Sequence, residues 1–432
     1  MNRDLFGQFA DPQTANPTLG RRDHLTFRGN VSQGRHGWLR LTPAYSLHVV
    51  REILNERSHD DLVLDPFSGT GTTPLVSASL GIPCHAVDIN PFLVWLGNLK
   101  TKPFEEDAAS ALRSAAQCIV ALVRKRKAYP QPWVPNIHAI EKWWDDEVLN
   151  ALGRLLESIH RVAERAQPDV VELLKIAFCR VMIQTAHVSF GHQSMSFKKR
   201  RISDDLPLFA DHGAREPCEA VCSLFLTHSN DVAATLPADE PKDKATVFVG
   251  DSRDLSDVLP SSDYTTVVTS PPYPNRMSYI RELRPYMYWL GHLTNGRQAG
   301  ELDWQAIGGT WGCATSLLGT WEPTTEQAIP YPRFNRIISA IRKDHDILGR
   351  YVHKYFQDIR QHVESLRAVL GGGARCYYLV GNSKFYGTLI PVEQIYAALF
   401  QDAGFLNLQI ETIRKRTSKK ELYEYLIYAE TP

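Results

Sequence analysis

The chemistry-bearing residues of this chain centre on a tract that reads Thr269-Ser270-Pro271-Pro272-Tyr273. The β-branched run at 265–268 leads into the tract and predicts a buried strand. The two consecutive prolines end that strand because neither has an N–H to donate to a neighbouring strand. The strand end would therefore present a hydroxyl, fixed backbone carbonyls and an aromatic ring. In an open α/β sheet, this carboxyl edge is where ligands bind.

Three carboxylates follow other predicted strands. The strand at 62–64 ends at Asp65, the strand at 84–87 ends at Asp88, and the strand at 246–249 is followed by Gly250-Asp251. Each acid fits a different part of one nucleoside ligand, since an acid at the end of a second strand can accept both ribose hydroxyls. An acid after the third strand can accept hydrogen bonds from an exocyclic amine.

A glycine-containing turn connects the first of these strands to a predicted helix. It reads Pro66-Phe67-Ser68-Gly69-Thr70-Gly71-Thr72-Thr73. Its glycines let the backbone approach a ligand closely, and the helix N-terminus offers free N–H groups. The turn is not Gly-x-Gly-x-x-Gly and no Walker lysine follows it, so dinucleotide and ATP phosphate sites are disfavoured. A cationic nucleoside suits this turn better.

Composition places the chain among ordinary globular proteins. It has 432 residues, of which 43% are hydrophobic, and Lys+Arg and Asp+Glu both number 48, so a nucleic-acid surface would require local clustering of charge. No apolar run is long enough to span a membrane, and the first residues lack a signal-peptide pattern. The seven cysteines include no Cys-x-x-Cys pair, so we expect reduced thiols, no metal and a cytoplasmic location.

The motifs above resemble those of the amino-DNA-methyltransferases, which methylate exocyclic amines of bases. The stretch from Asp65 to Thr72 resembles the motif around the methionine part of S-adenosylmethionine, and Ser270 to Tyr273 resembles the catalytic motif in its Ser-Pro-Pro-Tyr form. The segment from Arg35 to Ser46 resembles the cofactor-closing motif, and 378–383 a later sheet strand. Both long insertions are unmatched.

The resemblance implies a set of site residues. Those implied for catalysis are Ser270, Pro271, Pro272 and Tyr273. Those implied for binding S-adenosylmethionine are Tyr45, Asp65, Pro66, Phe67, Ser68, Gly69, Gly71, Thr72, Asp88, Ile89, Asp251 and Ser252.

The resemblance also implies a fold, and together with the change to helical periodicity between about 100 and 240 it indicates a domain organisation. The fold would be a Rossmann-like α/β sheet of the class I methyltransferases, mostly parallel with seven strands. Residues 1–100 would form an N-terminal arm, the cofactor-closing motif and the first βαβ unit, and 101–240 a helical insertion. The catalytic domain would continue over 241–291 and finish over 346–432. The Trp- and Arg-rich block at 292–345 is expected to be irregular and is our candidate for target recognition, with the helical insertion as the alternative.

The residues of the catalytic tract suit methylation of an amine. An exocyclic amine is a poor nucleophile because its lone pair is delocalised into the ring. The Ser270 hydroxyl and the Pro271 carbonyl can accept both amine hydrogens and favour a tetrahedral nitrogen, with positioning supplying most of the rate. The target base must leave the duplex, and Tyr273 offers a ring face for stacking.

The Ser-Pro-Pro-Tyr form is typical of enzymes that methylate N4 of cytosine in duplex DNA. The biological setting that the family implies is a restriction-modification system with a partner restriction endonuclease. Alternatives are methylation of adenine N6, methylation of RNA or a protein amide, and a non-catalytic DNA-binding module. Candidates for DNA contact are Asn275, Arg276 and the basic run Lys198, Lys199, Arg200 and Arg201, which is equally well explained as a solvated loop.

Overall fold

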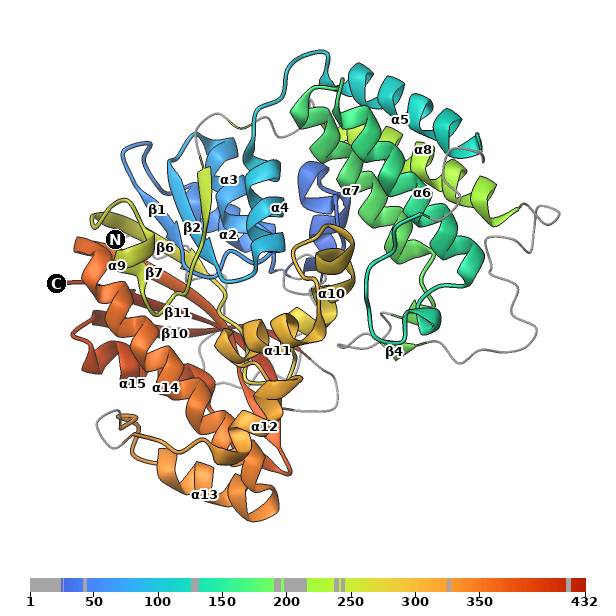
Figure 1. Cartoon of the computed structure of the whole chain (residues 1–432). Helices are drawn as coiled ribbons and strands as arrows, with labels where there is room; N and C mark the ends of the chain where they lie inside the picture. Colours follow the sequence, from blue (N-terminus) through green and yellow to red (C-terminus); the bar gives the residue numbers. More distant parts are fainter. Residues whose placement is uncertain are drawn as a thin grey trace.

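A seven-stranded sheet forms the centre of the protein, seen here in a computed structural model (Figure 1). The structure describes residues 25, 27–41, 45–125, 132–189, 196–197, 216–236, 241, 245–324, 328–416 and 421–432. The strand order is β10-β11-β7-β6-β1-β2-β5, with β11 antiparallel to both of its neighbours and the pairs from β7 to β5 parallel. The strands are β1 (Val63–Asp65), β2 (Cys84–Asp88), β5 (Ala245–Val249), β6 (Tyr264–Thr269), β7 (Leu370–Gly381), β10 (Leu406–Lys415) and β11 (Tyr423–Glu430). The predicted sheet is confirmed.

Helices cover both faces of the sheet because the buried strands carry apolar side chains on both sides. On β7, Tyr378 and Val380 pack with one set of helices, whereas Tyr377 and Leu379 point to the other face, as the two-residue period of a strand requires. The first face is covered by α14 (Asp346–Val369), α15 (Val392–Asp402) and the short α9 (Leu255–Val258), and the second by α2 (Leu47–Leu54), α3 (Thr72–Leu80) and α4 (Pro91–Thr101).

The helical insertion is confirmed and packs as a lobe beside the sheet, joined to it around α10 (Tyr279–Trp289) (Figure 1). Its interior is apolar and includes Trp143 and Trp144, both buried. Its helices are α5 (Ala108–Arg124), α6 (Asp146–Ala163), α7 (Pro168–Gln184) and α8 (Pro217–Thr235), and its strands β3 (Val188–Ser189) and β4 (Ser196–Phe197) form a separate pair. None of the helices in the described ranges is both long and apolar enough to cross a membrane.

The prediction of an irregular block at 292–345 was wrong. After α10 (Tyr279–Trp289), the chain forms α11 (Gly296–Gln305), α12 (Cys313–Thr320) and α13 (Phe334–Asp344). Asn295 caps α11 by accepting a hydrogen bond from the Gln298 N–H, a local start signal that the Gly- and Trp-rich composition obscured. A small hairpin, β8 (Ser383–Phe385) and β9 (Thr388–Ile390), follows β7.

Candidate active site

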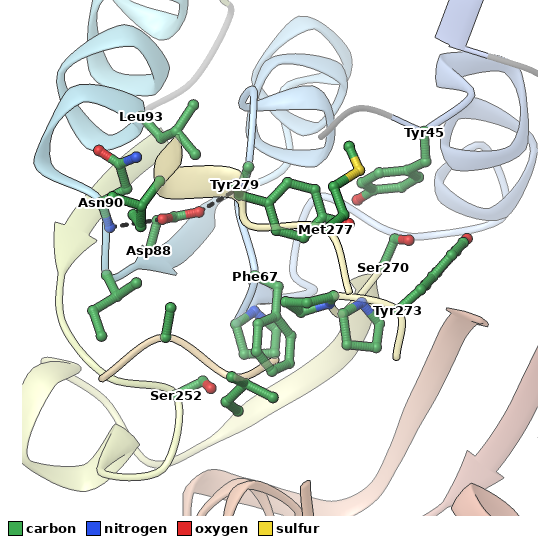
Figure 2. A pocket seen from close by; sticks show the side chains of 18 of the residues that line it. Tyr45, Phe67, Asp88, Asn90, Leu93, Ser252, Ser270, Tyr273, Met277 and Tyr279 are labelled. Atoms are coloured by element: carbon green, nitrogen blue, oxygen red, sulfur yellow. Dashed lines mark hydrogen bonds between the residues drawn. The ribbon is translucent and has the colours of Figure 1, made fainter. Parts of the chain in front are cut away.

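A cavity of about 280 Å³ lies at the carboxyl ends of β1, β2, β5 and β6 (Figure 2). It is where an open parallel sheet is expected to bind ligands. Figure 2 shows Asp88 and Asn90 on one side and Ser270 and Tyr273 on the other, with Tyr279 and Met277 between them. Of the residues expected from sequence to form the site, the cavity is lined by Tyr45, Pro66, Phe67, Gly69, Asp88, Ile89, Asp251, Ser252, Ser270, Pro271, Pro272, Tyr273 and Asn275.

Asp65 lies beneath the cavity and is fully buried. Its carboxylate accepts hydrogen bonds from the Thr269 hydroxyl at 2.6 Å, the Phe67 N–H at 3.1 Å and the Tyr45 hydroxyl at 3.2 Å. Burial raises the pKa of Asp65 to about 6, although these hydrogen bonds act in the opposite direction. Asp65 therefore ties the glycine-containing turn to β6 and to Tyr45. Ser68, Gly71 and Thr72 are also outside the cavity lining.

Asp88 reaches the cavity wall with its carboxylate already oriented. One oxygen accepts the Gly69 N–H at 2.8 Å and the other accepts the Asn90 N–H at 2.8 Å. Burial raises the pKa of Asp88 to about 7, and the nearby Asp65 charge adds to the effect. Each oxygen has a second lone pair, so Asp88 can accept two more hydrogen bonds from a ligand.

Asp251 has a partner that the sequence did not indicate. Arg253 donates to both carboxylate oxygens, from Nε at 2.9 and 3.1 Å and from Nη2 at 2.5 Å. The same guanidinium binds Asp358 on α14 at 2.9 Å and the Gln305 carbonyl at the end of α11 at 2.7 Å. Asp251 therefore anchors an arginine that joins the cavity to two helices.

The Ser-Pro-Pro-Tyr tract is held by strand β7 and by helix α14. Ser270 donates its hydroxyl hydrogen to the Leu379 carbonyl at 3.0 Å, so the lone pairs of Oγ remain available to accept hydrogen bonds. The Tyr355 hydroxyl donates to the Pro272 carbonyl at 2.7 Å and contacts the Tyr396 hydroxyl at 2.8 Å. These contacts fix the carbonyls and hydroxyl of the tract before any ligand binds.

Tyr273 carries contacts that sequence reasoning missed. Its hydroxyl donates to Glu424 Oε1 at 2.9 Å, and the Arg416 guanidinium lies 4.8 Å from the centre of its ring. Arg414 on β10 and Arg416 directly after that strand line the cavity together with Glu424 on β11. Further lining residues that were not predicted are Asn90, Leu93, Met277, Tyr279, Ile280, Gln305, Ala306 and Ile307. Asn90 and Leu93 lie close to Asp88 in the sequence, and 277–280 lies close to the Ser-Pro-Pro-Tyr tract, so closeness in sequence could have indicated these residues.

The residues predicted to contact DNA differ in their position relative to the cavity. Asn275 lines the cavity, whereas Arg276 is exposed outside its lining, with a φ of 62° and its N–H donated to the Tyr351 hydroxyl. The basic run Lys198, Lys199, Arg200 and Arg201 lies outside the described residues. The site that the structure does describe is therefore a cavity with an oriented acid at one end and the Ser-Pro-Pro-Tyr tract at the other.

Comparisons with known proteins find relatives at low sequence identity. No protein-family model matches the chain. The sequence is 22% identical over 447 residues to the Type II methyltransferase M.BsoBI of Geobacillus stearothermophilus, covering 94% of this chain and 85% of that protein. It is 20% identical over 435 residues to the Type II methyltransferase M.AvaI of Anabaena variabilis, covering 94% and 86%. It is 19% identical over 345 residues to the Type II methyltransferase M.MvaI of Kocuria varians, covering 78% and 73%.

Among solved structures, the rRNA methyltransferase aviRa from Streptomyces viridochromogenes aligns with 92% of this chain and 91% of its own, at 13% identity and a TM-score of 0.30. A TM-score of 0.30 is too low to relate the two folds. The strand order and the site at the carboxyl edge, together with Type II methyltransferases as relatives, show that this chain has a Rossmann-like class I methyltransferase fold.

Proposed function

We propose that this protein is the modification methyltransferase of a restriction-modification system, transferring a methyl group from S-adenosylmethionine to N4 of cytosine in duplex DNA. The single observation that carries the proposal is Ser270 at the cavity wall. Its hydroxyl hydrogen is committed to the Leu379 carbonyl, so Oγ is held as an acceptor for an amine hydrogen. The relatives named Type II methyltransferases support the same setting.

The residues of the cavity fit S-adenosylmethionine. Asp88 keeps acceptor capacity for two ribose hydroxyls, as the resemblance implies for this position. Phe67, Ile89 and Ile307 supply apolar wall for an adenine ring. Because Arg253 occupies the Asp251 carboxylate, we assign recognition of the adenine edge to the backbone at 250–252. When bound, S-adenosylmethionine supplies a methyl group on a positively charged sulfur that a nitrogen lone pair can attack.

The tract then acts by holding the target amine. Ser270 Oγ and the Pro271 carbonyl accept its two hydrogens, which draws the nitrogen lone pair out of conjugation with the base. Tyr355 fixes the neighbouring Pro272 carbonyl, so the tract keeps one geometry through the reaction. Preorganised acceptors of this kind contribute through orientation and cost no rearrangement at the moment of reaction.

Product analysis tests the proposal directly. Unmethylated plasmid DNA is incubated with the protein and S-adenosylmethionine labelled in its methyl group, and the DNA is then digested to nucleosides. We expect label in N4-methylcytosine. Label in N6-methyladenine would show that the enzyme methylates adenine and not cytosine. Absence of label from DNA, with transfer to RNA or peptide in parallel reactions, would overturn the DNA assignment.

The block at 292–345 remains our candidate for target recognition. Arg336 and Lys343 lie on the face of α13 opposite buried Phe334, and in the described part of the chain neither forms an ion pair with a carboxylate. Each should lower the slope of log affinity against log salt by about 1 when replaced by Gln, as expected for one phosphate contact. Arg113→Gln, at an exposed position on α5, tests the helical insertion in the same assay. If Arg113→Gln lowered this slope more than the two α13 substitutions did, target recognition would be assigned to the helical insertion instead.

A further inference from the structure

The C-terminal hairpin formed by β10 and β11 holds Tyr273 at two points. The Tyr273 hydroxyl donates to Glu424 Oε1 at 2.9 Å, and Arg414 Nε donates to the other carboxylate oxygen at 2.7 Å. Glu424 is 7% exposed, so Arg414 is the cation that compensates its charge in a mostly dry setting. The hydroxyl end of the ring is therefore fixed by a charge-assisted hydrogen bond.

The face of the same ring is fixed by Arg416. Its guanidinium lies 4.8 Å from the ring centre, and its Nη1 donates to the Asn382 carbonyl at 3.0 Å. Gly381 gives these groups room, since a Cβ at this position would lie 2.6 Å from Arg416 Nη1 and 2.8 Å from a Tyr273 ring carbon. Because Arg416 covers one face of the ring, that face is closed to a stacking base.

The charge of Arg416 is not used for an ion pair in the described part of the chain, in contrast to Arg414. A guanidinium is planar and weakly hydrated, so it stacks on an aromatic ring in a way that an ammonium group does not. The planar shape of Arg416 thus matters at this position as well as its charge.

We propose that Arg416 and Glu424 are positioning residues for the target base, and that they act by holding the Tyr273 ring in one orientation beside Ser270. This inference rests on the proposed function, because it assigns Tyr273 to the stacking of a flipped base. It also makes the far C-terminal hairpin part of the base-binding side of the cavity, although the hairpin lies about 140 residues from the tract in sequence.

Kinetics of the full-length protein on unmethylated plasmid DNA test this role. Arg416→Ala should lower kcat on the order of 10-fold to 100-fold, as expected when a reacting group is misplaced by about 1 Å. The affinity for S-adenosylmethionine, measured by calorimetry, should stay within about 2-fold, since Asp88 lies on the opposite side of the cavity from Tyr273. Arg416→Lys should not restore kcat, because it keeps charge and loses planarity.

Two further comparisons separate positioning from folding. Tyr273→Phe and Glu424→Gln each weaken the same hydrogen bond, so their effects on kcat should not add in the double variant. Arg57→Ala is the matched control, because the Arg57 guanidinium lies 6.0 Å from the ring of Tyr377, which is outside the cavity lining. This control should leave kcat unchanged.

The outcomes are distinct from those of the proposed function. If the wild type labels DNA and Arg416→Ala is as fast, or Arg416→Lys restores the rate, the positioning role is wrong. If Arg416→Ala loses cofactor affinity in proportion to kcat, its role is structural and the inference fails. The immobilised ring is tested without DNA by fluorine NMR of 3-fluorotyrosine at position 273. Arg416→Ala should narrow and shift this signal, and an unchanged signal would overturn the inference even if the protein methylates DNA.

Discussion

Replacing Asp88 by Asn is expected to stabilise the protein without ligand at alkaline pH while weakening its cofactor site. The pKa of Asp88 is raised from 3.8 to about 7, chiefly by burial. A carboxyl group with a raised pKa in the folded state contributes stability at low pH, and that contribution is lost as the pH rises through about 7. Ionised Asp88 is thus a cost to the fold that is present above neutral pH.

The size of the effect follows from the shift and from the hydrogen bonds. A pKa raised from 3.8 to about 7 corresponds to about 4 kcal/mol of penalty at pH 8.5, and partial exposure of Asp88 to solvent reduces this penalty. Asn keeps one acceptor for the Gly69 or Asn90 N–H and sets its NH₂ group against the other, which costs roughly 1 to 2 kcal/mol. The net gain in the free energy of unfolding should be about 1 to 2 kcal/mol at pH 8.5.

Urea unfolding of the ligand-free wild type and of Asp88→Asn at pH 8.5 and pH 4.5 measures this difference. At pH 4.5 the wild-type carboxyl is protonated in the folded state, so the variant should show no gain or a loss of about 1 kcal/mol. Calorimetry at pH 8 should show weaker binding of S-adenosylmethionine to the variant. A gain that is absent at pH 8.5, or equal at both pH values, would refute burial of the Asp88 charge as the cause.

Three other outcomes follow from the site. Ser270→Ala should lower methyl transfer to DNA by about 100-fold, measured with labelled cofactor, while cofactor affinity measured by calorimetry stays unchanged. Gly71→Ala should lower the free energy of unfolding by about 1 to 3 kcal/mol more than Gly373→Ala, since both have positive φ but only at Gly71 would Cβ meet the backbone of Gly97, at 3.0 Å. Burial lowers the pKa of Lys100 to about 7, so Lys100→Met should raise the melting temperature relative to wild type more at pH 6 than at pH 9.5. The reverse order of the two pH values would contradict a buried, uncompensated lysine.

Local patterns in the sequence were sufficient to predict four strands of the sheet and the two ends of the cavity, whereas the seven-stranded arrangement was implied by the family resemblance. The β-branched run of β6, the prolines that follow it and the acid that ends β2 each act within a few residues. Parallel strands bring their carboxyl ends to one edge, so Asp88 and Ser270 could be assigned to one site before the structure was known. The role of each residue on that edge remains a prediction that the experiments above test.

Tertiary structure decided what surrounds those residues. Arg253 takes the Asp251 carboxylate because α11 and α14 converge on it, and Asp65 is buried because β6 and Tyr45 close over it. The antiparallel register of β11 on β7 sets Glu424 opposite Gly381, and Gly381 in turn abuts Tyr273. A register between distant strands depends on the packing of whole sheet faces, which no local pattern records. The sequence therefore determined which edge could do chemistry, and the pairing of distant strands determined how Tyr273 is held there.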